Sequence, residues 1–245
     1  MLAIEFLQDP AKPPAEPVYT VFGDDAFLRR EVLEAIGRVV LHAETDGELA
    51  ISRFAGDQAT LADVLDEVRT VPFLARRRVV IVEGADPFVT AHRKELEAYV
   101  ERPSSSGVLV LSVKTWPAST RLAKLVDKAG LAIECKGPPE RELASWLVHV
   151  ARSRCWTQLD DDAARLLSEL VGPEAGLLVS EIEKLAVYVG NRAKIHRDDV
   201  ARMVGAGRIE TIWKTLDAAT TGRGDLALDH LDGLLASGEH PVGLL

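Results

Sequence analysis

Short apolar runs alternate with amphipathic helical patterns along the first half of the chain, and this alternation limits the fold more than any other feature. The apolar runs have the length and β-branched content of strands, and the segments between them place leucine and valine at helical spacing. Strands that alternate with helices form right-handed crossovers and a parallel sheet with helices on both faces. The pattern therefore predicts an α/β domain with a five-stranded sheet. The expected strands are PVYTVFG (17–23), ELAISRF (48–54), RVVIVEG (78–84), GVLVLSV (107–113) and LAIEC (131–135).

A change of pattern at KGPPE (136–140) divides the chain. Two consecutive prolines mark the boundary, and helical patterns follow it with no further strand expected. We therefore predict that the α/β domain spans residues 18–138 and that a small helical domain spans residues 139–205.

The two ends of the chain differ from these domains. Residues 1–17 are rich in proline and are predicted to be an extended lead-in. Helical patterns at 209–220 and 225–236 form a pair, and one pair cannot bury its apolar face alone. We therefore expect residues 206–245 to be the first helices of a third domain.

Composition and charge disfavour several classes of protein. The formal net charge is −9, whereas a domain dominated by non-specific DNA binding is usually basic. No apolar run approaches the ~18 residues of a membrane span, and the N-terminus lacks a signal-peptide pattern. The cytoplasm is therefore the expected location. Cys135 and Cys155 indicate no disulfide framework, and Cys135, in an apolar run, is expected to be a reduced core thiol.

The turn after the first strand, VFGDDAFL (21–28), lies where P-loop proteins bind phosphate. Their motif, G-x-x-x-x-G-K-[ST], uses glycines to open backbone N–H groups and a lysine to contact the phosphates. Here Gly23 is followed by Asp24 and Asp25, and neither a second glycine nor a lysine follows. The carboxylates would repel phosphate but suit the positive end of a helix. We expect a capped helix here and no productive ATP binding.

Other signs of catalysis are weak. Glu83 ends the third apolar run, where a magnesium-binding acid would lie, but a solvated strand end is the commoner role for a single acid. The histidines never pair at metal-binding spacing, and no G-x-S-x-G motif is present. We predict no catalytic residue, no metal site and no cofactor.

The segment TVPFLARRR (70–78) is the unusual feature of the chain. Phe73 and Leu74 are large apolar residues in an expected surface connection, and three arginines follow them. One interpretation is that both apolar side chains fold back onto the domain. A second is an apolar plug for a partner's pocket, with arginines at its rim. A third is contact of Arg76–Arg78 with nucleic acid, although solvation is the commoner fate of such a short run.

The order and spacing of these segments resemble the delta subunit of the bacterial DNA polymerase III clamp loader. The resemblance covers the chain from about Val18 to Leu245 and implies a degenerate RecA-like AAA+ domain, a helical lid-like domain and the start of a helical collar that is longer in the family. The segments that carry it are VYTVFGDDAFLRREVLEAI, VPFLARRRVVIVEGAD, GVLVLSVKTW, RLAKLVDKAG and GLLVSEIEKLAVYVG.

The resemblance also implies a function. A protein of this family is a non-ATPase subunit of the DNA polymerase III holoenzyme, a nucleotidyltransferase complex, and it binds and opens the sliding clamp (beta). By this resemblance Phe73 and Leu74 would enter the clamp's hydrophobic pocket, and Val71 and Pro72 would shape the turn. Some members have the pair in the order leucine then phenylalanine. The implied partners are the clamp, the gamma/tau and delta prime subunits, and primer–template DNA, with no membrane. The alternatives are an active AAA+ ATPase and a DNA-binding module.

Overall fold

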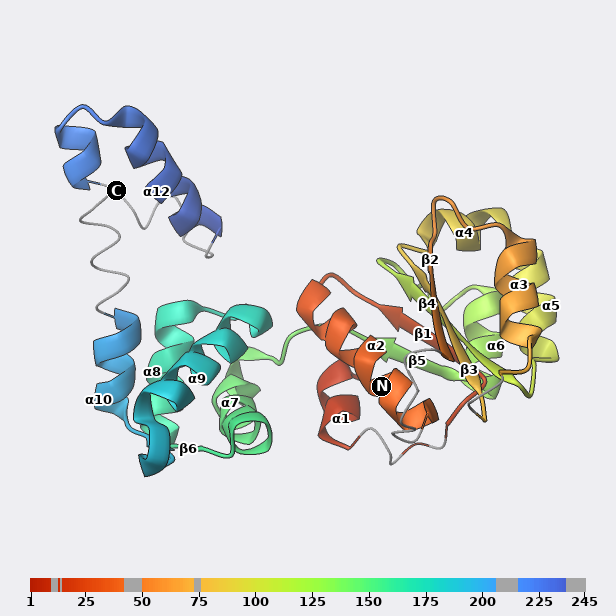
Figure 1. The fold of residues 1–245 in the computed structure, drawn as a ribbon, viewed down its shortest axis with the longest axis horizontal. Coiled ribbons are helices and arrows are strands. Elements are labelled where there is room, and N and C mark those ends of the chain that lie inside the picture. The colour runs from red at the N-terminus through yellow and green to blue at the C-terminus, as the bar shows by residue number, and fades with distance from the viewer. Residues whose placement is uncertain (10–12, 14, 42–49, 73–75, 206–215, 237–245) are drawn as a thin grey trace. The chain divides into compact units, whose positions relative to one another are not determined.

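The computed structural model describes residues 1–9, 13, 15–41, 50–72, 76–205 and 216–236. The chain divides into two compact units, Met1–Lys136 and Gly137–Leu245 (Figure 1). The boundary falls beside the two prolines. It lies in residues 135–139, which form neither helix nor strand and join the last strand of the first unit to the first helix of the second.

The first unit is built on a parallel sheet of five strands in the order β2-β3-β4-β1-β5. The central strand β4 is buried along its whole length, as a strand covered on both faces must be. This confirms the predicted α/β class and the parallel sheet. The strands are β1 (Val18–Phe22), β2 (Ile51–Ala55), β3 (Arg78–Glu83), β4 (Gly107–Val113) and β5 (Leu131–Glu134).

Helices cover both faces of this sheet (Figure 1). On one face α2 (Ala26–Leu41) packs with α1 (Ala3–Gln8). The other face carries the helices α3 (Leu61–Arg69), α4 (Asp86–Ala91), α5 (Arg93–Glu101) and α6 (Arg121–Ala129). Val80 and Val82 of β3 belong to the apolar core under α3–α6. Their neighbours Val79 and Ile81 are also buried and point to the opposite face, because side chains alternate along a strand.

The expected extended lead-in of residues 1–17 contains a helix. Helix α1 buries Ala3, Ile4 and Phe6, and it contacts α2. Ahead of it, the Glu134 N–H donates to the Met1 carbonyl at 2.9 Å, so the N-terminus extends the edge of β5. The prolines that suggested an extended chain begin only at residue 10, which leaves the apolar residues before them free to form a helical turn.

The second unit is mainly helical, as predicted for residues 139–205. Its longest helices pack against one another, and their buried residues include Leu147, Leu167 and Leu185. The helices are α7 (Glu140–Cys155), α8 (Asp161–Val171), α9 (Ala175–Val189) and α10 (Arg197–Val200), followed by a π-helical turn at Ala201–Gly205.

A small parallel sheet in this unit was not predicted, since no strand was expected after residue 140. Strand β6 (Gln158–Leu159) pairs with β7 (Lys194–Ile195). The carboxylate of Asp160, directly after β6, accepts from Lys194 at 3.0 Å and lies 2.7 Å from His196 Nδ1. Two-residue strands are too short for an alternating pattern to mark them in the sequence.

Residues 216–236 contain helical structure as expected. Residues 216–220 are helical, and α12 spans Gly224–Ala236. Most of the helix predicted at 209–220 lies outside the described residues, and a separate domain over 206–245 stays a prediction. Among the residues that the structure describes, no helix combines the length and the apolar character needed to cross a membrane.

Candidate functional site

Helix α3 positions the start of the loop that the sequence singled out. The helix begins after Thr60, whose hydroxyl oxygen accepts a hydrogen bond from the Asp63 N–H at 3.2 Å. Val64 and Val68 are fully buried in the core of the first unit. These contacts fix the helix on the sheet and leave its opposite face, which includes Asp66, in solvent.

The loop from residue 70 to residue 77 connects α3 with β3. Val71 is exposed over 77% of its surface, whereas Pro72 is buried. Phe73, Leu74 and the residue after them lie outside the described residues, so their predicted contacts stay predictions. Just before the predicted apolar pair, the loop thus has an exposed apolar residue, Val71, followed by a buried proline, Pro72.

An ion pair joins the two ends of this loop. The Arg78 guanidinium donates to Glu67 Oε1, and the Ser52 hydroxyl donates to the same oxygen at 2.6 Å. The Ser52 hydrogen bond is the main cause that holds the pKa of the Glu67 carboxyl below its ordinary value, and Arg78 acts in the same direction against the opposing effect of burial. Sequence reasoning missed Glu67, because its partners come from two other elements.

The end of α3 is also attached to the start of β4. The Ser106 hydroxyl donates to the Arg69 carbonyl at 3.1 Å, and the Ser106 carbonyl accepts from the Arg78 N–H at 3.0 Å. Gly107 approaches the helix so closely that a Cβ there would lie 2.0 Å from the Val68 carbonyl oxygen. Only glycine fits this contact without a backbone shift. The close packing holds the end of α3, where the loop starts, against β4.

The three arginines of the loop have different surroundings. Arg77 donates to the Ala15 carbonyl at 3.3 Å, and Arg78 is engaged by Glu67. Arg76 is exposed. Two of the three guanidinium groups therefore contact the domain itself, which weakens the nucleic-acid interpretation of this run.

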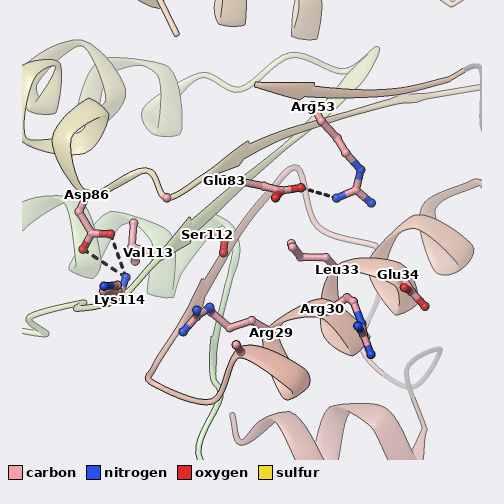
Figure 2. A pocket seen from close by; sticks show the side chains of 12 residues that line it. Arg29, Arg30, Leu33, Glu34, Arg53, Glu83, Asp86, Ser112, Val113 and Lys114 are labelled. Carbon is pink, nitrogen blue, oxygen red and sulfur yellow. Dashed lines mark hydrogen bonds and ion pairs between the residues drawn. The ribbon is translucent and has the colours of Figure 1, made fainter. Parts of the chain in front are cut away.

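A second candidate region is a pocket of about 460 Å³ at the carboxyl ends of β3 and β4, beside α2 (Figure 2). Parallel α/β sheets usually bind ligands at this edge. Figure 2 shows that several of its charged side chains are engaged within the chain, since Arg53 contacts Glu83 at 2.5 Å and the Asp86 carboxylate accepts a hydrogen bond from the backbone N–H of Lys114 at 3.0 Å. Glu83 is thus a half-exposed, ion-paired strand end.

The turn beside this pocket uses its backbone donors internally. The Gly23 N–H donates to the Lys114 carbonyl at 3.2 Å, and the Asp25 N–H donates to the Cys135 carbonyl at 3.3 Å. The Asp25 carboxylate accepts the Leu28 N–H at 2.8 Å, which confirms the predicted helix cap. These N–H groups are the kind that a phosphate cradle leaves open.

The described residues hold no group of three or more histidine, cysteine or carboxylate side chains placed to bind a metal ion. Cys135 is fully buried, as predicted for a core thiol, and burial raises its pKa to about 12. Cys155 is partly exposed, and burial is again the main cause that raises its pKa.

The sheet order, the helices on both faces and the helical unit that follows define a RecA-like, AAA+-like fold. In the turn after β1, where such folds bind phosphate, the N–H groups of Gly23, Asp25 and Leu28 donate to the chain itself. Residues 19–136 match the family described as DNA polymerase III, delta subunit. DNA polymerase III subunit delta of Bacillus subtilis strain 168 is 26% identical over 245 residues, which cover 96% of this chain and 70% of that protein. The chain is thus similar to DNA polymerase III delta subunits, by the family match over residues 19–136 and by the relative that matches along nearly its whole length.

A solved structure supports the fold. The Bacillus subtilis DNA clamp loader delta protein superposes with a TM-score of 0.68 at 24% identity, over 99% of this chain and 73% of that one. Domain III of the Thermotoga maritima replication initiation protein DnaA gives a TM-score of 0.47 at 16% identity, over 83% of this chain and 88% of that one. The first superposition confirms the predicted fold class.

Proposed function

We propose that this chain is the clamp-loader delta subunit that binds the sliding clamp and opens it for loading onto primed DNA during replication. Similarity to DNA polymerase III delta subunits and to a clamp loader delta protein supports a role in the clamp loader. The observation that carries the finer proposal is the loop between α3 and β3. It is attached to the domain at both ends, and it exposes Val71 two positions before the apolar pair Phe73 and Leu74.

The pair Phe73 and Leu74 enters the apolar pocket of the clamp. Val71 and the buried Pro72 shape the turn that presents them, and α3 supports the loop from the sheet. Adjacent apolar anchors in a desolvated pocket carry most of the energy of an interface. Arg76, which is exposed and follows the pair by two positions in the sequence, lies at the rim of the contact.

Clamp opening follows from a difference in affinity. A protein that binds the open ring better than the closed ring favours opening only by that difference, and each tenfold preference supplies about 1.4 kcal/mol. ATP acts on the neighbouring gamma/tau subunits, which assemble with this chain, delta prime and primer–template DNA. The chain itself turns over no ATP, and it acts in the cytoplasm, where the chromosome is copied.

The two alternatives are disfavoured by specific contacts. An active ATPase needs open N–H donors at the turn after β1, and there Gly23 and Asp25 donate to the chain's own carbonyls. A DNA-binding module acting through the arginine run would need Arg77 and Arg78 free, and both contact the domain.

The test is direct binding to the sliding clamp of the same organism. A mixture of the chain and the clamp should co-elute on size exclusion, and a fluorophore pair across the clamp's subunit interface should report ring opening when the chain is added. Co-elution without a change in fluorescence would limit the function to clamp binding. Failure to co-elute, with the chain folded by circular dichroism, would refute the proposal.

A further inference from the structure

The base of the 70–77 loop is closed by one partly shielded ion pair. Glu67 lies in the last turn of α3, and Arg78, eleven positions later, is the first residue of β3. The Arg78 side chain is 18% exposed and the Glu67 side chain 28%. Water and salt weaken a shielded pair less than a fully exposed one, so this contact holds its geometry better than most surface pairs.

The Glu67 carboxylate joins three elements of the fold. Its Oε1 atom, carried by α3, accepts hydrogen bonds from Ser52 of β2 and from Arg78 of β3. The Nε atom of Arg78 is buried and has no hydrogen-bond partner among the described residues. Loss of the Glu67 charge would therefore leave a largely enclosed guanidinium without its counter-charge, which favours a shift of the Arg78 side chain toward water.

A second attachment lies beside this pair. Ser106 contacts both ends of the loop, through its hydroxyl to Arg69 and through its carbonyl to Arg78. These hydrogen bonds fix the backbone at both ends of the loop. The Glu67–Arg78 ion pair then sets the direction in which the loop enters β3. A loop held in its binding conformation before association loses less entropy on binding, and affinity rises accordingly.

We infer that Glu67 is a positioning residue for the clamp-binding loop: by holding Arg78 and Ser52 at the loop base, it presents residues 71–74 to the clamp. This inference rests on the proposed function. In this role Glu67 does not touch the clamp. Its effect on clamp affinity acts through the position of Phe73 and Leu74. If Glu67 positions the loop, its effect on affinity depends on the presence of the apolar pair. If Glu67 contacted the clamp directly, its effect would not depend on that pair.

The experiment compares clamp affinity by calorimetry for the unmodified chain and for Glu67→Gln, which keeps the shape of the side chain and removes its charge. We expect Glu67→Gln to weaken binding by roughly tenfold. In a Leu74→Ala background the same substitution should have a clearly smaller effect, because positioning matters less when the positioned side chain is gone. Hydrogen exchange of the unbound chain should be faster at residues 70–77 in Glu67→Gln.

The matched control is Arg53→Gln, which breaks the Arg53–Glu83 ion pair between β2 and β3 and lies away from the loop. It should leave clamp affinity unchanged. Ser52→Ala serves as a second variant in case Glu67→Gln fails to fold, and it should weaken binding less than the loss of the charge. Equal affinity of the folded Glu67→Gln or Ser52→Ala variant and the unmodified chain would overturn the inference and leave the proposed function standing. If the unmodified chain does not bind the clamp, the proposed function fails, and the inference fails with it.

Discussion

The guanidinium of Arg29, in the first turn of α2, donates a hydrogen bond to the carbonyl oxygen of Gly23, the residue directly after β1. In a phosphate-binding turn the nearby cation faces the ligand. Here the cation faces the chain's own backbone, and the N–H groups of Gly23 and Asp25 are also used internally. The turn keeps the position of a nucleotide site while its donors stabilise the junction between β1 and α2.

This arrangement predicts that ATP does not bind. Titration of the chain with a fluorescent ATP analogue and Mg²⁺ should give no saturable signal up to ~1 mM, which corresponds to less than about 4 kcal/mol of binding free energy. Arg29→Ala should not restore binding, since Asp24 and Asp25 remain at the helix entrance and repel phosphate. Saturable micromolar binding that unlabelled ATP displaces would contradict this account of the turn.

Gly23→Ala should destabilise the first unit. Gly23 has φ +123°, a backbone conformation that residues with a Cβ rarely adopt, and a Cβ there would lie 2.3 Å from the Cys135 carbonyl oxygen. We expect a loss of ~2 kcal/mol or more in the free energy of unfolding, measured by urea denaturation. Gly37→Ala, in the middle of α2, is the control: its Cβ would meet only the tip of Ile51 at 3.3 Å, and its cost should be much smaller. Similar losses for both variants would refute the steric argument.

Cys135 should be chemically inert in the folded chain. Because its pKa is raised to about 12 by burial, almost none of the reactive thiolate is present near pH 8. In a Cys155→Ser variant, a thiol reagent should modify Cys135 only at the rate of unfolding. In a Cys135→Ser variant, the partly exposed Cys155 should react faster. Rapid modification of Cys135 in folded protein would show that the end of β5 is open to solvent.

The contribution of Glu67 to stability should depend on pH in a defined direction. Its pKa is lowered in the folded chain, so its stabilisation is complete above the unfolded pKa of about 4.3 and is lost as the pH falls through the folded value. The difference in unfolding free energy between the unmodified chain and Glu67→Gln should therefore be constant around neutral pH and shrink in acid. Ser52→Ala should shift this loss to higher pH, because the Ser52 hydrogen bond is the main cause of the lowered pKa. A difference that stays constant down to about pH 2 would contradict the role given to the carboxylate.

The sequence was sufficient to predict the sheet because the strands are buried apolar runs. β3 and β4 match the predicted ranges to within a residue, and the capping role of Asp25 followed from its place before a helix. The two-residue strands β6 and β7 were not predictable, since so short a segment carries no period. Helix α1 was not predicted, because the prolines after residue 9 led to the expectation of an extended segment over the whole of residues 1–17.

The candidate site was only partly predictable. The unusual apolar pair at 73–74 is visible in the sequence, because large apolar residues are uncommon in a surface loop. The pairing of Glu67 with Arg78 and Ser52 depends on how α3 packs across β2 and β3. No pattern within one segment marks such a contact. For the same reason, the arginine run suggested nucleic acid before its tertiary contacts were known.

The most direct test of the central claim is calorimetric binding of the chain to its own sliding clamp, with the double variant Phe73→Ala/Leu74→Ala measured alongside. The exposed apolar pair Val187 and Tyr188 of α9 provides a matched double alanine control in the other unit. We expect the unmodified chain and the α9 control to bind equally, and the loop variant, still folded by circular dichroism, to lose ~3 kcal/mol or more. Equal binding by the loop variant and the unmodified chain would show that the contact lies elsewhere and would contradict the account.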